Sequence, residues 1–201
     1  MVAVLASLGG LAAVSAVLSG LPADFPAAVL IVQHRRRELG EDRLAPLLAQ
    51  RTALPVRTAE HGSSVHSPGV VVLPGGGCPA RLDPFGRLVL PENRDLYPGD
   101  VLLRSLATVW GRSVLAVVLT GMLRDGTEGI KMVKGSGGRV LVQDPATARA
   151  PSMPTSALTT GCVDFALPLE RISAALVALT MAPGGADLLN AASTPWTRVA
   201  G

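Results

Sequence analysis

Short runs of small and branched aliphatic residues recur along this chain, and amphipathic stretches separate them. Because aromatic residues make up only 3% of the 201 residues, the core must be built from valine, leucine, isoleucine and alanine. Such runs are typical of parallel strands that are buried on both faces. Strands are therefore expected at residues 2–6, 29–33, 55–58, 69–73, 114–119, 139–142 and 163–167.

Helices are expected in the stretches between these runs. In one of these stretches Leu44, Leu47 and Leu48 fall on one face of a helical wheel, and the charged residues fall elsewhere. Strands that alternate with helices predict a doubly wound, Rossmann-like α/β fold, in which helices cover both faces of a mostly parallel sheet. Residues 78–90, with the turn sequence DPFG, are predicted to form a small hairpin insertion. The helices are expected at residues 10–19, 41–51, 99–110, 125–134 and 169–181.

The composition argues against several classes of protein. Hydrophobic residues make up 48% of the chain and charged residues 16%, which is far from the composition of disordered chains. The net charge is +3, but lysines and arginines are scattered, and we interpret the one basic cluster, the arginines at 35–37, as a solvated loop. Without a basic face that carries aromatic residues, nucleic-acid binding is not expected. Cys78 and Cys162 are too few for a disulfide framework or a metal site, so no metal is expected.

The start of the chain carries no charged side chain before Asp24, and residues 4–14 look like the apolar segment of a secretion signal. We reject that interpretation, because no Lys or Arg precedes the run and the fold needs it as its first strand and helix. Later apolar runs are interrupted within about ten residues, too short for a membrane span, so direct membrane insertion is not expected. Residues 1–182 are expected to form one domain. Residues 183–201 lose periodicity and are expected to be a C-terminal extension, a candidate for disorder or partner binding.

Three residues that can act together in catalysis each follow a different expected strand. Ser7 follows the first strand, His34 follows the second, and Asp125 lies in the loop after residues 114–119. The carboxyl ends of parallel strands share one edge of the sheet, so these side chains are expected to meet there. A serine hydroxyl needs a base to remove its proton, and a histidine oriented by an aspartate supplies one. The pattern predicts a hydrolase acting on an acyl bond, with the backbone N–H groups of Met122 and His34 as candidate oxyanion donors.

Each of these residues also has a structural interpretation. Ser7 and Asp125 can serve as amino-terminal caps of the helices that follow them, a role that serine and aspartate often fill. A single histidine after a strand, such as His34, is commonly structural. His61 and His66 lie in a connection rich in Gly, Ser and Pro and are expected to face solvent, which leaves His34 as the candidate base.

Four motifs lie in the same order as in a known family. Three are short, namely ASLGG, VQH and VVVLPGGG, and the fourth is the long and highly specific VVLTGMLRDGTEGIKMVKGSGGRVLVQDPATARAPSMPTSAL. From Val2 to about Leu176 the chain therefore resembles the catalytic domain of the CheB-type chemotaxis protein-glutamate methylesterases. The resemblance implies a cytoplasmic enzyme that hydrolyses γ-glutamyl methyl esters on the cytoplasmic helices of chemoreceptors and that can also deamidate glutamines.

The resemblance also assigns roles to individual residues. Ser7 would be the nucleophile, His34 the general base and acid, and Asp125 the orienting carboxylate. Met122 would donate its backbone N–H to the oxyanion. No metal or organic cofactor is implied. The family often carries an amino-terminal receiver domain. Because the first expected strand begins at the second residue, we expect a member without a receiver domain.

The chain departs from the family pattern close to these residues. Leu5 and Leu123 stand where the family usually has glycine, Leu8 stands where it has threonine, and Cys78 stands where it has histidine. The segment RRRELG replaces a proline-rich stretch, and LYPGDVLLRSL keeps Asp100 but little else of its motif. These changes leave the three catalytic side chains in place, and they predict a divergent methylesterase with a different or narrower substrate.

Two other functions compete with the hydrolase. The leucines around Ser7 also fit a non-catalytic binding module that keeps the fold and groove and acts in protein–protein interaction. A nucleotide-binding domain is disfavoured, because no G-x-G-x-x-G follows the first strand. The geometry of Ser7, His34 and Asp125, and the access to Ser7, distinguish the hydrolase from the binding module.

Overall fold

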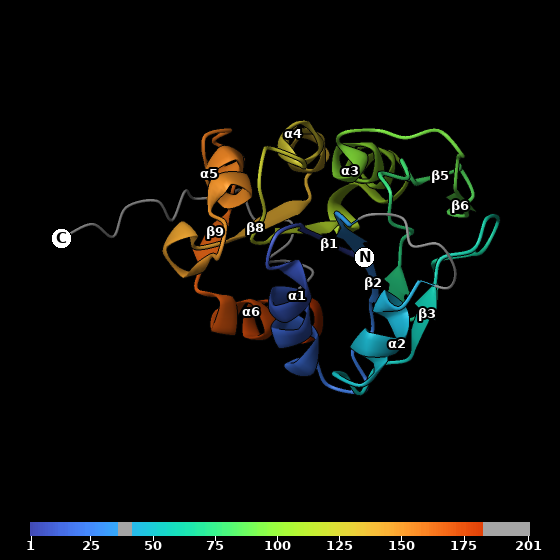
Figure 1. Cartoon of the computed structure of the whole chain (residues 1–201), viewed down its shortest axis with the longest axis horizontal. Coiled ribbons are helices and arrows are strands. Elements are labelled where there is room, and N and C mark those ends of the chain that lie inside the picture. The colour runs from blue at the N-terminus through green and yellow to red at the C-terminus, as the bar shows by residue number, and fades with distance from the viewer. Residues whose placement is uncertain (36–41, 183–201) are drawn as a thin grey trace.

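A computed structural model of the chain describes residues 1–35 and 42–182, and these form three layers (Figure 1). The middle layer is a seven-stranded parallel sheet with the order β3-β4-β2-β1-β7-β8-β9. The sequence predicts each of these strands to within two residues at either end, and the predicted doubly wound α/β fold is confirmed. The strands are β1 (Val2–Ala6), β2 (Ala28–Gln33), β3 (Val56–Thr58), β4 (Gly69–Val72), β7 (Leu115–Val118), β8 (Arg139–Gln143) and β9 (Phe165–Leu167).

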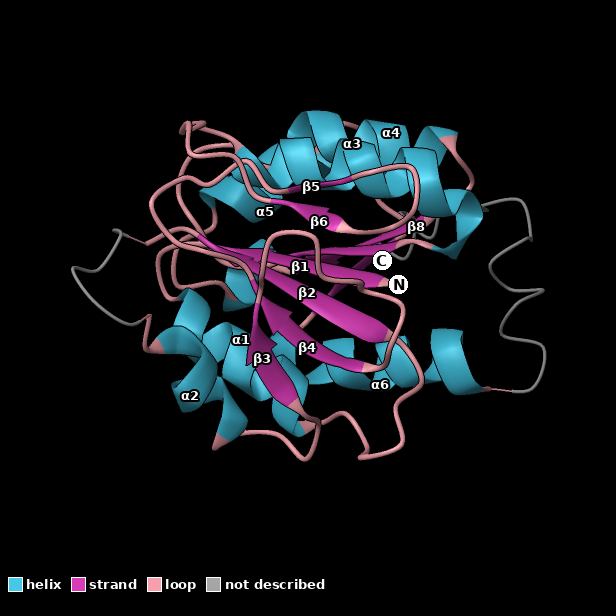
Figure 2. Ribbon diagram, turned by 90° about the vertical axis from the view of Figure 1, so that its right-hand side faces the viewer, coloured by secondary structure: helices cyan, strands magenta, loops and turns pink. Residues whose placement is uncertain are grey.

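Helices cover both faces of the sheet, as Figure 2 shows from the side. Alternate residues of β1 point to opposite faces, so that Val2, Val4 and Ala6 join one core while Ala3 and Leu5 join the other. In the part of the chain that the structure describes, no helix is long and apolar enough to span a membrane. One face carries α1 (Gly10–Ser19), α2 (Leu44–Ala49) and α6 (Leu169–Met181), and the other carries α3 (Pro98–Trp110), α4 (Thr127–Gly135) and α5 (Ser152–Leu158).

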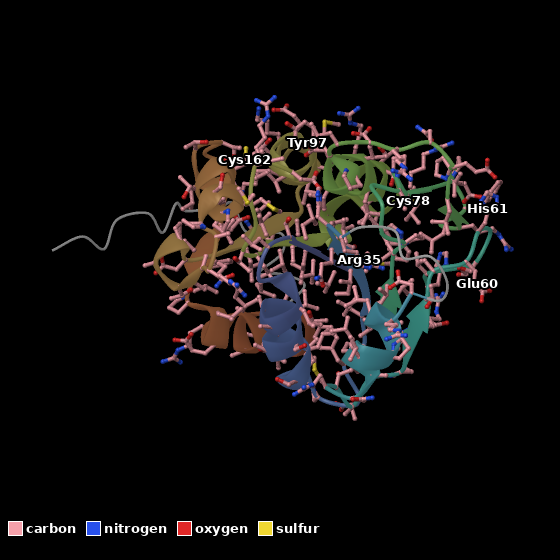
Figure 3. All side chains as sticks on the ribbon, viewed as in Figure 1. Arg35, Glu60, His61, Cys78, Tyr97 and Cys162 are labelled. Atoms are coloured by element: carbon pink, nitrogen blue, oxygen red, sulfur yellow. The ribbon has the colours of Figure 1, made fainter. Side chains whose placement is uncertain are left out.

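The predicted hairpin insertion is present beside α3. Strands β5 (Arg81–Leu82) and β6 (Leu88–Val89) pair antiparallel, and the backbone N–H of Leu82 donates to Ser105 Oγ of α3 at 3.0 Å. The connection before it carries His61 and His66, both exposed as expected. Figure 3 shows His61 at the outer edge of the molecule.

Helix α5 is absent from the sequence-based expectation, and its prolines explain why. Pro154 lies in the first turn of the helix, where its missing N–H breaks no helical hydrogen bond. Strand β9 begins two residues later than expected. Before it, the buried Asp164 carboxylate accepts the backbone N–H of Val140 at 2.8 Å and contacts Lys134 Nζ at 2.5 Å and Arg139 Nη1 at 3.1 Å. Asp164 therefore joins β8 and α4 through its side chain instead of continuing the strand.

The interpretation of the basic cluster as a solvated loop is wrong for Arg35. Its guanidinium is mostly buried, forms an ion pair with Asp42, and donates to the carbonyls of Gln33 at 3.1 Å and Leu73 at 3.0 Å. These contacts join the end of β2 to the end of β4 and to the start of α2. Figure 3 labels Arg35. The helix expected at 41–51 is shorter than predicted, because α2 spans only Leu44–Ala49. Its expected first residue, the other two arginines of the cluster and the extension expected at 183–201 lie outside the described residues.

Candidate functional site

The site lies where the order of the strands reverses at the centre of the sheet. Strand β1 has β2 and β4 on one side and β7 and β8 on the other, so the loops after β1 and β7 frame a crevice at their carboxyl ends. The backbone N–H of Ser7 donates to the carbonyl of Thr120 at 3.0 Å, and that of His34 donates to Ala6 at 2.9 Å. Backbone hydrogen bonds thus join the end of β1 and the loop after it to the loops after β7 and β2, which carry the other two candidate residues.

His34 and Asp125 meet in a short contact. His34 Nε2 lies 2.5 Å from Asp125 Oδ2, and the aspartate side chain is 1% exposed while the histidine side chain is 26% exposed. Asp125 also accepts the backbone N–H groups of Gly99 at 2.8 Å and Asp100 at 3.0 Å, at the start of α3. Because Nε2 faces the carboxylate, Nδ1 is the ring nitrogen left to exchange a proton with another group.

The alternative role of Asp125 as the cap of the following helix is wrong. The cap of α4 is Gly126, and no side chain caps that helix. Asp125 binds the start of α3 instead, an element that precedes it by about 25 residues in the chain. Burial raises the pKa of the neighbouring Asp100, whose carboxylate accepts the N–H of Gly129 at 2.7 Å.

Ser7 is likewise not the cap of the helix that follows it. Gly9, with a φ of 81°, occupies the cap position of α1, and no side chain caps the helix. A Cβ on Gly10 would lie 2.8 Å from Ala6 Cβ, so the sharp turn from β1 into α1 needs both glycines. Among the residues that the structure describes, Ser7 Oγ has no hydrogen-bond partner, and Ser7 and His34 line one groove of about 830 Å³.

Two residues that hold this turn escaped the sequence analysis. Thr120 Oγ1 donates to the carbonyl of Leu8 at 2.9 Å and accepts the N–H of Ala150 at 2.8 Å. Gln143 Oε1, at the end of β8, accepts the N–H of Thr120 at 2.9 Å. Both residues belong to the long motif that begins VVLTGMLRDG. Its Leu-Thr-Gly and Gln-Asp segments could have indicated them.

The peptide between Gly121 and Met122 is fixed by the segment at the start of α5. The carbonyl of Gly121 accepts the N–H of Met153 at 2.9 Å, and the N–H of Gly121 donates to the carbonyl of Ala150 at 2.9 Å. Described peptide bonds are all trans, so the N–H of Met122 points away from Met153. The prediction that the backbone N–H of His34 is a second oxyanion donor is wrong. That N–H donates to the carbonyl of Ala6 where β2 pairs with β1.

Gly121 packs so tightly against Ser7 that its substitution is expected to disturb the site. A Cβ added there would lie 2.1 Å from Met153 Sδ and 2.8 Å from Ser7 Cβ. Gly121→Ala should lower the free energy of unfolding by about 1–3 kcal/mol, as overpacking commonly does. Chemical denaturation checks this, with Met153→Ala added to Gly121→Ala as a second variant. If close packing against Met153 is the cause, Gly121→Ala costs less stability in the Met153→Ala background, with Met153→Ala alone as the reference, than it does in the wild-type chain. An unchanged denaturation midpoint for Gly121→Ala would contradict the expectation.

The three leucines that depart from the family pattern do not close the groove over Ser7. Leu5 is fully buried on the opposite face, where its Cδ2 would lie 2.3 Å from a Cβ on Gly99. Leu8 is exposed and forms part of the groove wall. Leu123 is exposed with a φ of 66°, the left-handed region that glycine adopts most readily, and its carbonyl accepts the Ser152 hydroxyl at 3.1 Å.

Within residues 1–35 and 42–182, no group of three or more His, Cys, Asp or Glu side chains is placed to hold a metal ion. Cys78 and Cys162 form no disulfide.

The fold and the site define a class of protein: a doubly wound α/β domain that gathers a serine, a histidine and a buried aspartate at the switch point of its sheet. The sequence matches the CheB methylesterase family over residues 2–176. The chain belongs to this family.

Similar proteins agree with this assignment. The chain is 41% identical over 177 residues to a protein-glutamate methylesterase/protein-glutamine glutaminase 2 of Anaeromyxobacter dehalogenans, covering 87% of this chain and 52% of that protein. It is 40% identical over 181 residues to the protein-glutamate methylesterase FrzG of Myxococcus xanthus, covering 88% and 54%. The chain therefore spans about half the length of these relatives.

A solved structure is similar over nearly its whole length. The CheB methylesterase catalytic domain of Thermotoga maritima superimposes with a TM-score of 0.81 at 32% identity, covering 89% of this chain and 97% of that chain. The likeness confirms the three-layer fold and the expected family.

Proposed function

We propose that this chain is a cytoplasmic serine hydrolase that removes methyl groups from γ-glutamyl methyl esters of chemoreceptor helices or a related methylated protein. The contact of His34 with the buried Asp125, beside Ser7 in an open groove, carries the proposal. The names of the similar methylesterases support the choice of ester. The proposal includes no metal, no organic cofactor and no nucleic acid.

In the proposed reaction the three side chains act together. Nδ1 of His34 takes the proton of Ser7 Oγ as the oxygen attacks the ester carbonyl carbon, and Asp125 stabilises the resulting imidazolium. The N–H of Met122 stabilises the oxyanion, and His34 returns the proton to the departing methoxide, which leaves as methanol. Water then attacks the acyl-serine with His34 as base, releasing the glutamate carboxylate and restoring Ser7. A glutamine amide would follow the same route, with ammonia as the leaving group.

Covalent labelling of Ser7 tests the proposal against the binding-module alternative. A fluorophosphonate probe reacts with a serine whose hydroxyl is activated by a base, and peptide mass spectrometry locates the modified residue. We expect Ser7 to be labelled, and His34→Gln to slow the labelling strongly. Folded protein that remains unlabelled, and that releases no methanol from a γ-methyl glutamyl peptide, would favour a non-catalytic module.

A further inference from the structure

The groove beside Ser7 carries two positive charges from different parts of the fold. Arg51 lies just after α2 and Arg149 lies in the segment before α5; both are exposed and both line the groove. Within the described ranges neither guanidinium forms an ion pair. Among the described residues no acidic side chain lines the groove, and the first turn of α1 carries none. The described walls of the groove therefore present positive charge without a counter-charge.

Arg149 is held close to the nucleophile. A Cβ on Gly9 would lie 3.0 Å from both Cβ and Cδ of Arg149, so the aliphatic stem of the arginine packs on the turn that carries Ser7. Its position is thus set by the same turn that positions the serine. A charge on a substrate next to the reacting ester would come within reach of this guanidinium.

The groove that the two arginines line also has large apolar side chains in its wall. Leu8, Leu11 and Leu47 line it, and each is 40–48% exposed. Large hydrophobic side chains that are this exposed and adjacent often mark a surface where a partner binds. A groove that combines apolar side chains with two cations is complementary to an amphipathic helix that has acidic residues beside its apolar stripe.

We propose that Arg51 and Arg149 are specificity-determining residues, which select glutamyl esters on an amphipathic helix with carboxylates at neighbouring positions. The inference rests on the proposed function, since it names the substrate of that groove. The leucines receive the apolar stripe of the helix, and each arginine pairs with a carboxylate one helical turn from the ester. Exposed ion pairs are weak individually, so each arginine is expected to change affinity about threefold and the two together about tenfold.

Binding to an inactive variant tests the charge selection without turnover. Two fluorescent helical peptides carry one γ-methyl glutamyl ester each, with Glu in the first peptide and Gln in the second at the positions three and four residues away. Fluorescence anisotropy on Ser7→Ala measures both dissociation constants, since the ester survives. The same measurement on Ser7→Ala with Arg149→Gln, and with Arg51→Gln, gives the contribution of each arginine. Gln keeps most of the stem of Arg149, which preserves its packing on Gly9.

Arg112→Gln is the matched control, because Arg112 is exposed and lies before β7, at the opposite end of the sheet from the groove. We expect the acidic peptide to bind about tenfold more tightly than the neutral one. Each groove substitution should reduce that preference about threefold, while Arg112→Gln leaves it unchanged. Raising the salt from about 0.1 M to about 1 M should abolish the preference.

Equal binding of the two peptides, or an unchanged preference in both groove variants, would overturn the charge proposal. A preference that Arg112→Gln reduces as much as the groove variants do would show a net-charge effect and would also overturn it. Labelling of Ser7 is measured separately on the wild-type chain. If charge selection is absent and Ser7 is labelled, only this inference is contradicted. If charge selection is present and Ser7 is not labelled, only the proposed hydrolase is contradicted.

Discussion

Ser7→Ala is expected to reduce the release of methanol from a γ-methyl glutamyl peptide by about 10⁴- to 10⁶-fold, because triad residues act as a unit. The substitution removes the hydroxyl that His34 activates in the proposed mechanism. Since Ser7 Oγ has no hydrogen-bond partner among the described residues, its removal costs little stability. Thermal unfolding should therefore shift by no more than a few degrees while the rate collapses.

The matched control for this experiment is Ser19→Ala. Ser19 lies at the far end of α1, where its hydroxyl donates to the carbonyl of Ala16 at 3.0 Å. Its loss should leave kcat/KM within about twofold of the parent, since surface substitutions seldom have large effects. If Ser7→Ala retained a tenth or more of the parental rate, another nucleophile would have to be sought.

Asp125→Ala is expected to produce the second largest effect, and it should affect both rate and stability. The rate should fall by about 10³- to 10⁴-fold, because the imidazolium of His34 loses its counter-charge. The free energy of unfolding should fall by about 1–3 kcal/mol, because the N–H groups of Gly99 and Asp100 lose a buried acceptor. Kinetics and chemical denaturation of the same preparation measure both quantities.

Asp125→Asn separates the two roles of this carboxylate. The amide oxygen can still accept an N–H from the start of α3, so Asn should recover much of the stability that Ala loses. It carries no charge, and its NH₂ group cannot stabilise an imidazolium, so the rate should stay low. Recovery of the rate together with the stability would mean that Asp125 acts by holding α3 rather than by its charge.

The fold could be predicted from the sequence because its central elements are unambiguous. Strand β1 is apolar on both faces and α1 begins at the second glycine of a pair, so the predicted bounds of both elements were correct. The gathering of Ser7, His34 and Asp125 at one edge follows from the parallel sheet alone. What could not be predicted depends on contacts between distant segments. Asp125 binds the start of α3, and Leu5 points to the far core, although each looked like a local feature of its own loop.

Three further features were missed or misassigned, each for a different reason. Prolines at the start of α5 concealed a helix that holds the peptide of Gly121, and no periodicity in so short a segment could reveal it. Arg35 looked like part of a solvated basic loop, but its partner Asp42 and the carbonyl of Leu73 come together only in the folded chain. The backbone N–H of His34 was an oxyanion candidate until the pairing of β2 with β1 was known.

The hydroxyl of Thr120 has a consequence for the dynamics of the molecule. Because it bonds the turn after β1 and the segment before α5 together, neither can detach without breaking bonds that the other shares. Amide hydrogen exchange in the two segments should then report one opening event with one free energy, so that they behave as a single cooperative unit. The turn after β1, which contains two glycines, is therefore held in place by the segment that follows β8.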